Sequence, residues 1–127
     1  MKIYVAAPWD YRETARQAGQ TLSEAGFRVV STWWYREDQG SQHYGPDAAA
    51  DLDELQKADV LIVLNLCISE GKAVELGYAL AQKKMVIVVG ERSRVNIFHY
   101  LPQVVNTGTL DDALAVLACV MSVGVKP

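Results

Sequence analysis

The 127-residue sequence has few cysteines and no apolar run long enough for a membrane span. Its two cysteines, Cys67 and Cys119, are too few for the disulfide framework of a small secreted protein, so we expect buried free thiols in a reducing cytoplasm. The most apolar stretch, residues 113–125, is shorter than the roughly 20 residues of a transmembrane helix. The first residues also lack the pattern of a signal peptide. We therefore expect a cytoplasmic protein with no membrane partner.

An excess of positive charge is missing as well. Twelve basic residues stand against fifteen acidic ones, without a basic run, which argues against a nucleic-acid polymer as the partner. The glycine-rich loops GxGxxG and GxxxxGK[ST], which hold dinucleotides and nucleoside triphosphates, do not occur. His43 and His99 are isolated and lack metal-ligand spacing. The sequence therefore predicts a small ligand, no cofactor and no metal.

Half of the residues are apolar, enough for the core of a single domain over residues 1–127. Apolar strand patterns alternate with helical patterns. We expect strands at residues 3–7, 27–32, 58–64 and 85–89 with a short segment at 101–105, and helices at 11–25, from Pro46, at 72–82 and after Thr109. This alternation predicts an α/β fold, a doubly wound, flavodoxin- or Rossmann-like parallel sheet of about five strands in three α/β/α layers. Ligands of such sheets bind beyond the carboxyl ends of the strands.

Two carboxylates are candidates for chemistry near those strand ends. Glu75 is the one charged residue between Ala73 and Ala81, near the start of a helix whose dipole stabilises an anion. A Glu bonded to a neighbouring loop or facing solvent remains an equal alternative. Asp51 lies on the preceding helix, and two carboxylates from separate elements would suit work at a glycosidic carbon. Its neighbours Asp53 and Glu54 are expected only to solvate an exposed helix face.

Smaller groups surround these carboxylates. Ser69 and Gly71 lie where a loop turns into a helix, so they could hold an anion or a hydroxyl, although a plain N-cap is the simpler reading. Aromatic residues at strand ends could stack on a flat heterocycle. These are Tyr4, Trp9, Trp33, Trp34 and Tyr35. Core packing is the alternative, and we expect it for at least one of the two adjacent tryptophans.

Three segments together resemble a known family. Ile3-Tyr4 with Trp9, Asp51-Leu52 ahead of Ala58-Asp59-Val60, and Gly71 followed by Glu75-Leu76-Gly77-Tyr78-Ala79-Leu80 with Lys84 are similar to the nucleoside 2-deoxyribosyltransferase family. The likeness spans residues 3 to about 101. The segment around Glu75 is its specific part.

The resemblance implies a role for each matching residue. Glu75 would be the nucleophile that attacks the anomeric carbon of a deoxyribose, Tyr4 would orient it, and Asp51 would protonate the departing base. Asn96 resembles an Asn that reaches into a neighbouring subunit to bind the sugar 5′ hydroxyl, which implies a homodimer or a higher homo-oligomer. The expected substrate is a small nucleoside or nucleotide, bound by Ser69, Gly71, Trp9, Asn96 and Ala6.

The sequence also departs from the transferases. Six residues before Glu75 the transferases tend to carry an Asp, whereas Ser69 is shared with the related 2′-deoxynucleoside 5′-monophosphate N-glycosidases. Those hydrolases hold the phosphate with hydroxyl and Arg groups in the first loop, where this chain has Ala7-Pro8-Trp9-Asp10. Transfer and hydrolysis therefore both stay open, and so does a non-catalytic nucleotide sensor that uses the same pocket.

Overall fold

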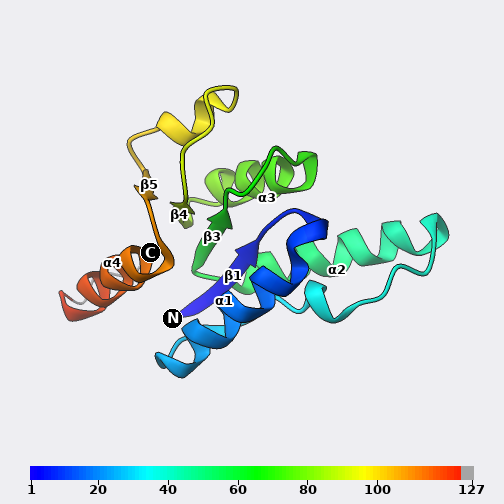
Figure 1. Cartoon of the computed structure of the whole chain (residues 1–127), viewed down its shortest axis with the longest axis horizontal. Coiled ribbons are helices and arrows are strands. Elements are labelled where there is room, and N and C mark those ends of the chain that lie inside the picture. Colours follow the sequence, from blue (N-terminus) through cyan, green and yellow to red (C-terminus); the bar gives the residue numbers. More distant parts are fainter. Residues whose placement is uncertain (124–127) are drawn as a thin grey trace.

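The computed structural model describes residues 1–123, which form one five-stranded parallel sheet between two layers of helices (Figure 1). The strand order is β2-β1-β3-β4-β5. The strands are β1 (Lys2–Ala6), β2 (Arg28–Val29), β3 (Val60–Leu64), β4 (Met85–Val89) and β5 (Val104–Thr107). The helices are α1 (Arg12–Glu24), α2 (Tyr44–Lys57), α3 (Glu70–Ala81) and α4 (Leu110–Ser122). Short 3-10 helices are η1 (Trp9–Tyr11), η2 (Trp33–Tyr35), η3 (Ser41–His43) and η4 (Ile97–Tyr100).

The strand order explains the layers. The connection from β1 through α1 to β2 runs toward one edge of the sheet, and the connection from β3 through α3 to β4 runs toward the other. Because such connections are right-handed, α1 and α3 lie on opposite faces. Helix α2 contacts α3 and shares its face, while α4 packs on β4 and β5 (Figure 1). The predicted doubly wound fold is confirmed.

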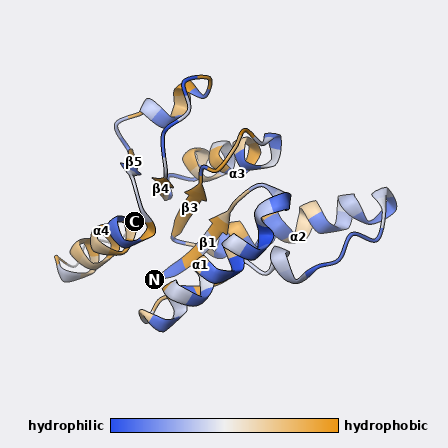
Figure 2. Cartoon of the chain, viewed as in Figure 1, coloured by the Kyte–Doolittle hydropathy of each residue, from blue (hydrophilic) through white to orange (hydrophobic). Residues whose placement is uncertain are grey.

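The hydrophobic core lies on both faces of the central strands. Every residue of β3 is buried, as expected for a central parallel strand, and Figure 2 shows β3 as an apolar ribbon. Each helix places one leucine against the sheet. These are Leu22, Leu55, Leu76 and Leu117, all at most 2% exposed. No helix within residues 1–123 is long and apolar enough to cross a membrane.

Two local expectations are wrong. The strand expected at 27–32 is only Arg28–Val29, and neither residue is buried, because β2 is an edge strand that pairs with β1 alone. Cys67 and Cys119 are free but exposed rather than buried. Strand β3 ends before Cys67 is reached, and the buried side of α4 is made by Ala113 and Leu117, which leaves Cys119 on the outer side.

Candidate active site

Tyr4 on β1 and Glu75 on α3 lie close enough for each to shift the pKa of the other. Tyr4 is fully buried, and neither its hydroxyl nor Glu75 Oε2 has a hydrogen-bond partner among the described residues. Burial raises the pKa of Glu75 to about 7, the Tyr4 hydroxyl offsets part of that rise, and the charge of Asp51 adds to it. Burial and then the Glu75 charge raise the pKa of Tyr4 above its ordinary value. Glu75 therefore changes its charge near neutral pH, next to a phenol that stays protonated.

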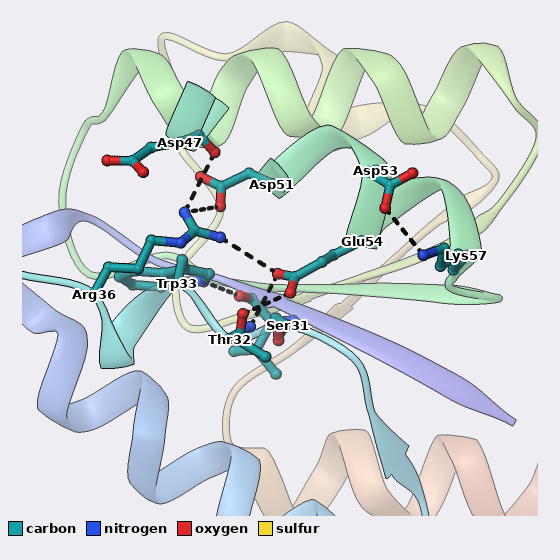
Figure 3. A network of polar contacts seen from close by, with 10 residues as sticks. Ser31, Thr32, Trp33, Arg36, Asp47, Asp51, Asp53, Glu54 and Lys57 are labelled. Atoms are coloured by element: carbon teal, nitrogen blue, oxygen red, sulfur yellow. Dashed lines mark hydrogen bonds and ion pairs between the residues drawn. The ribbon is translucent and has the colours of Figure 1, made fainter. Parts of the chain in front are cut away.

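Asp51 is held by an arginine that the sequence analysis did not single out (Figure 3). Arg36 Nη1 donates to Asp51 Oδ1 at 2.5 Å and to the Asp47 carbonyl at 3.3 Å. Arg36 Nη2 lies 3.8 Å from Glu54 Oε1. Glu54 in turn accepts from the Thr32 amide at 3.0 Å and from the Thr32 hydroxyl at 2.6 Å. One face of α2 is thereby tied to the segment that follows β2.

This arrangement corrects one expectation and bears out another. Glu54 does not simply solvate an exposed face, because its side chain is 19% exposed and bonded as described. Asp53 does point outward, where its side chain is 62% exposed and pairs with Lys57 at 3.0 Å. One step along a helix turns the side chain by about 100°, which separates the two. Asp47, Asp51 and Glu54 share a face at spacings of four and three, and that row was the signal for a nearby cation.

Asp51 opens onto an aromatic cavity of about 390 Å³. The Trp9 and Trp33 rings line it, with centroids 6.2 Å apart and planes at 39°. Trp33 is fixed by a 2.8 Å hydrogen bond from its Nε1 to the Val5 carbonyl. Trp9 is 40% exposed and lies under the Arg12 guanidinium, 4.7 Å from the ring centroid. The cavity therefore offers aromatic rings beside carboxyl groups, an arrangement that suits stacking of a heterocyclic base.

The adjacent tryptophans behave as expected of core residues. Trp33 is 6% exposed and Trp34 is 8% exposed, so packing holds for both. Trp33 nevertheless contributes to the cavity wall. Ala6, at the end of β1, is fully buried. Its predicted contact with substrate stays a prediction.

Ser69 and Asn96 line a second cavity, of about 650 Å³, between α3 and the segment around η4. The Ser69 hydroxyl accepts from the Lys72 amide at 3.3 Å and so caps α3. Asn96 Oδ1 accepts from the Phe98 amide at 3.1 Å and caps η4. Gly71 is exposed in the first turn of α3. Both capping roles lie within the chain, and the predicted substrate contacts of these residues stay predictions.

Lys72 is a buried cation in the wall of this second cavity. Its side chain is 6% exposed, and its Nζ donates to Asn65 Oδ1 at 2.9 Å. Asn65 Nδ2 in turn donates to the Glu91 carbonyl, which joins α3 to the loop after β4. Gly90, at the start of that loop, has φ +107°, and a Cβ there would lie 3.3 Å from the Asn65 carbonyl oxygen. A lysine in the first turn of a helix normally predicts an exposed side chain. The burial of Lys72 was therefore not predictable from the sequence.

The structure thus brings the predicted residues together in two groups. Tyr4, Glu75 and Asp51 are electrostatically coupled, and Asp51 shares the aromatic cavity with Trp9. Ser69 and Asn96 share the second cavity. Within residues 1–123 no group of three His, Cys, Asp or Glu residues is placed to hold a metal ion.

Fold and site together define a Rossmann-like α/β protein with coupled carboxyl groups and an aromatic cavity at its strand ends. The chain belongs to the nucleoside 2-deoxyribosyltransferase family, whose sequence model matches residues 3–120. The resemblance drawn from the sequence is therefore confirmed, over a longer stretch than the quoted segments covered. No curated protein matches the sequence.

Two solved structures share the fold. The CMP N-glycosidase of Clostridium botulinum superposes with a TM-score of 0.62 and 18% identity, over 93% of this chain and 99% of that one. The 2-deoxyribosyltransferase of Bacillus psychrosaccharolyticus has a TM-score of 0.67 and 21% identity, over 89% of this chain and 90% of that one. At these identities the likeness concerns the fold.

Proposed function

We propose that this protein cleaves the N-glycosidic bond of 2′-deoxynucleosides through a covalent intermediate on Glu75 and transfers the deoxyribose to another base or to water. The observation that carries the proposal is the state of Glu75. Its Oε2 is buried and free of hydrogen bonds among the described residues, and Glu75 lies within the residues that the family model matches. An oxygen that no other group holds is available to attack C1′.

The chemistry follows from the two coupled carboxyl groups. The base stacks in the cavity lined by Trp9 and Trp33, next to Asp51. A Glu75 oxygen bonds to C1′ while the C1′–N bond breaks, and the electron pair of that bond leaves with the base. Asp51 gives a proton to the base, and Tyr4 orients Glu75. A second base or water then attacks C1′ and releases the Glu75 carboxylate.

A second candidate is release of the base from 2′-deoxynucleoside 5′-monophosphates. Lys72 favours it, because this cation lines the same cavity as Ser69. The name of the Clostridium botulinum structure points the same way, to a nucleotide substrate. Free nucleosides remain the first choice, because Lys72 is buried and bonded to Asn65. In the first loop, moreover, the charge of Asp10 repels a phosphate and Pro8 has no amide N–H to donate to it.

We further propose that the working form is a homodimer or a higher homo-oligomer. Apolar side chains surround the second cavity at high exposure. They are Ile68 (77%), Val95 (73%), Ile97 (70%) and Phe98 (55%). Such a cluster is unusual on a monomer, and a second copy would cover it while bringing Asn96 close to a neighbouring site. The free thiols of Cys67 and Cys119 support a cytoplasmic location.

The test is incubation with deoxynucleosides and their 5′-monophosphates, with and without an acceptor base, followed by chromatography of free and transferred base. The wild-type protein should release base, and Glu75→Gln should bind the same substrates without turnover. Binding without base release by the wild-type protein would instead identify a nucleotide sensor. Turnover by Glu75→Gln near the wild-type rate would exclude the covalent intermediate.

A further inference from the structure

We propose that Arg36 is a positioning residue for the proton donor Asp51. It aims the carboxyl group at the aromatic cavity and stabilises the carboxylate that remains once the proton has passed to the leaving base. The inference rests on the proposed function. It adds to that function a residue that the family resemblance did not supply.

The first argument is orientation. Arg36 donates to Asp51 Oδ1, and no hydrogen bond within residues 1–123 reaches Oδ2. Asp51 and Arg36 both line the aromatic cavity, together with Trp9. One oxygen is thus fixed by the guanidinium, and the other is left to exchange a proton with a bound base. The 2.5 Å hydrogen bond from Arg36 to Oδ1 fixes the rotation of the carboxyl group about its Cβ–Cγ bond. This orientation is the one that the proton exchange through Oδ2 needs.

The second argument is that Arg36 is itself held in place. Its Nη1 also donates to the Asp47 carbonyl, and its Nη2 approaches Glu54. Glu54 is anchored by two hydrogen bonds from Thr32 (Figure 3). The Arg36 side chain is 24% exposed, which distinguishes it from a solvated surface cation. An arginine with several partners loses little freedom when it supports another residue.

The third argument is charge. Asp47 and Glu54 face Asp51 from α2, Glu75 couples to it from α3, and Glu37 and Asp38 line the same cavity. Burial raises the pKa of Asp51 and the α2 carboxylates add to the rise, whereas Arg36 lowers it. Without Arg36, the pKa of Asp51 would be higher and the carboxyl group would hold its proton more tightly. The carboxylate formed after proton transfer would then stand among acidic neighbours with no cation beside it. A weaker acid transfers its proton less readily to a poor leaving group.

The proton balance is complete. The O–H bond of Asp51 breaks as an N–H bond forms on the base, while the C1′–N electron pair moves onto the base and Glu75 forms the bond to C1′. The negative charge that Glu75 gives up appears on Asp51, beside the Arg36 guanidinium. Arg36 therefore matters for a base that must be protonated in order to leave. It matters little for a leaving group that departs as a stable anion.

The test compares Arg36→Gln with Arg36→Lys and with Lys57→Gln, a matched control that removes a cation from the exposed ion pair on the outer face of α2. Each variant is assayed on a deoxynucleoside and on a nitrophenyl deoxyriboside, whose leaving group needs no proton. Arg36→Gln should lose at least about tenfold more kcat on the deoxynucleoside than on the nitrophenyl substrate. Arg36→Lys should recover part of the loss, and Lys57→Gln should match the wild-type protein on both.

A direct readout accompanies the rates. Titration of the Asp51 carboxyl by carbon-13 NMR should show a higher pKa in Arg36→Gln than in the wild-type protein, and no change in Lys57→Gln. Equal losses on both substrates, or an unchanged Asp51 titration, would overturn the inference. If Arg36→Gln does not fold, Arg36→Lys carries the test. Lysine keeps the charge but loses the planar guanidinium contacts to Asp51 and Asp47, so the loss of kcat in Arg36→Lys must again be larger on the deoxynucleoside than on the nitrophenyl substrate.

Failure of the proposed function gives a different pattern. In that case the wild-type protein cleaves neither the deoxynucleoside nor the nitrophenyl deoxyriboside, so the comparison of leaving groups has no signal to begin with. An active wild-type protein, an inactive Glu75→Gln and an Arg36→Gln that behaves like Lys57→Gln would retain the function and reject only the role of Arg36.

Discussion

The phenol of Tyr4 and the carboxyl of Glu75 influence each other's protonation in opposite directions. Burial dominates both groups, but beyond it the Glu75 charge raises the pKa of Tyr4, and the Tyr4 hydroxyl lowers that of Glu75. A nucleophilic carboxylate must be ionised at the working pH. Tyr4 thus favours the reactive form of Glu75 in a site whose burial opposes it.

The pH dependence of turnover should report this pair. On a nitrophenyl deoxyriboside, which needs no proton from Asp51, activity should rise with pH through about 7 as Glu75 ionises. Tyr4→Phe removes the interaction that lowers the Glu75 pKa, so the rise should move to higher pH. The measurement is kcat against pH for both proteins. A rise that stays in place in Tyr4→Phe would show that Tyr4 acts on Glu75 through packing alone.

Stability should follow the same carboxyl group. The pKa of Glu75 is raised in the folded protein from 4.5 to about 7, so the folded state binds the proton more tightly and loses stability as pH rises through this window. The shift corresponds to up to about 3 kcal/mol of unfolding free energy. Glu75→Gln should therefore raise Tm by more than about 3 °C at pH 8 and by less at pH 5. Calorimetry at the two pH values decides, and an equal Tm change at both would contradict a buried, titrating Glu75.

Removal of the acid should depend on the leaving group. Asp51→Asn should slow release of a natural base by about 10²- to 10⁴-fold and should affect a nitrophenyl deoxyriboside much less, because general-acid help matters most for poor leaving groups. Steady-state kinetics on both substrates provide the comparison. An equal loss on the two would make Asp51 a residue that only positions the base.

The 5′ end of the substrate distinguishes the two candidate functions. We expect kcat/KM for a free deoxynucleoside to equal or exceed that for its 5′-monophosphate, because the buried Lys72 ammonium is already bonded to Asn65. A preference of more than about tenfold for the monophosphate, roughly 1.4 kcal/mol in the transition state, would favour the nucleotide hydrolase. Lys72→Met is the companion variant. If Lys72 binds the phosphate, this variant should lose kcat/KM on the monophosphate and keep it on the free deoxynucleoside.

The apolar cluster around the second cavity should mediate assembly. Ile97→Asp combined with Phe98→Asp places charge where a second copy would pack, and it should shift the protein toward monomers with reduced activity. Light scattering and the base-release assay are read on the same samples. Met121→Asp is a suitable control, because this residue is exposed on α4, away from the cluster. A wild-type protein that is monomeric and fully active would refute the assembly.

Much of the fold and part of the site were predictable from local patterns. Alternating apolar segments predicted the parallel sheet, and the unusual position of Glu75 in an apolar helix marked it as a candidate. The acidic row on α2 indicated a nearby cation, but neither the identity of Arg36 nor the anchoring of Glu54 was predictable, because both depend on how the segment after β2 folds back onto α2. The expected burial of Cys67 was wrong for a related reason. Strand β3 ends at Leu64 as predicted, and the exposure of Cys67 depends on the course of the loop that follows, which apolar content alone does not show.

The approach of Gly90 to Asn65 has a mechanical consequence. The loop that carries Asn96 leaves the sheet at a backbone angle that favours glycine, and Asn65 links it at once to Lys72 on the helix that carries Glu75. The helix that carries Glu75 and the loop that carries Asn96 are therefore both anchored on the Asn65 side chain. In the proposed mechanism, the nucleophile and the residue expected to recognise the sugar thus depend on one shared anchor in the fold.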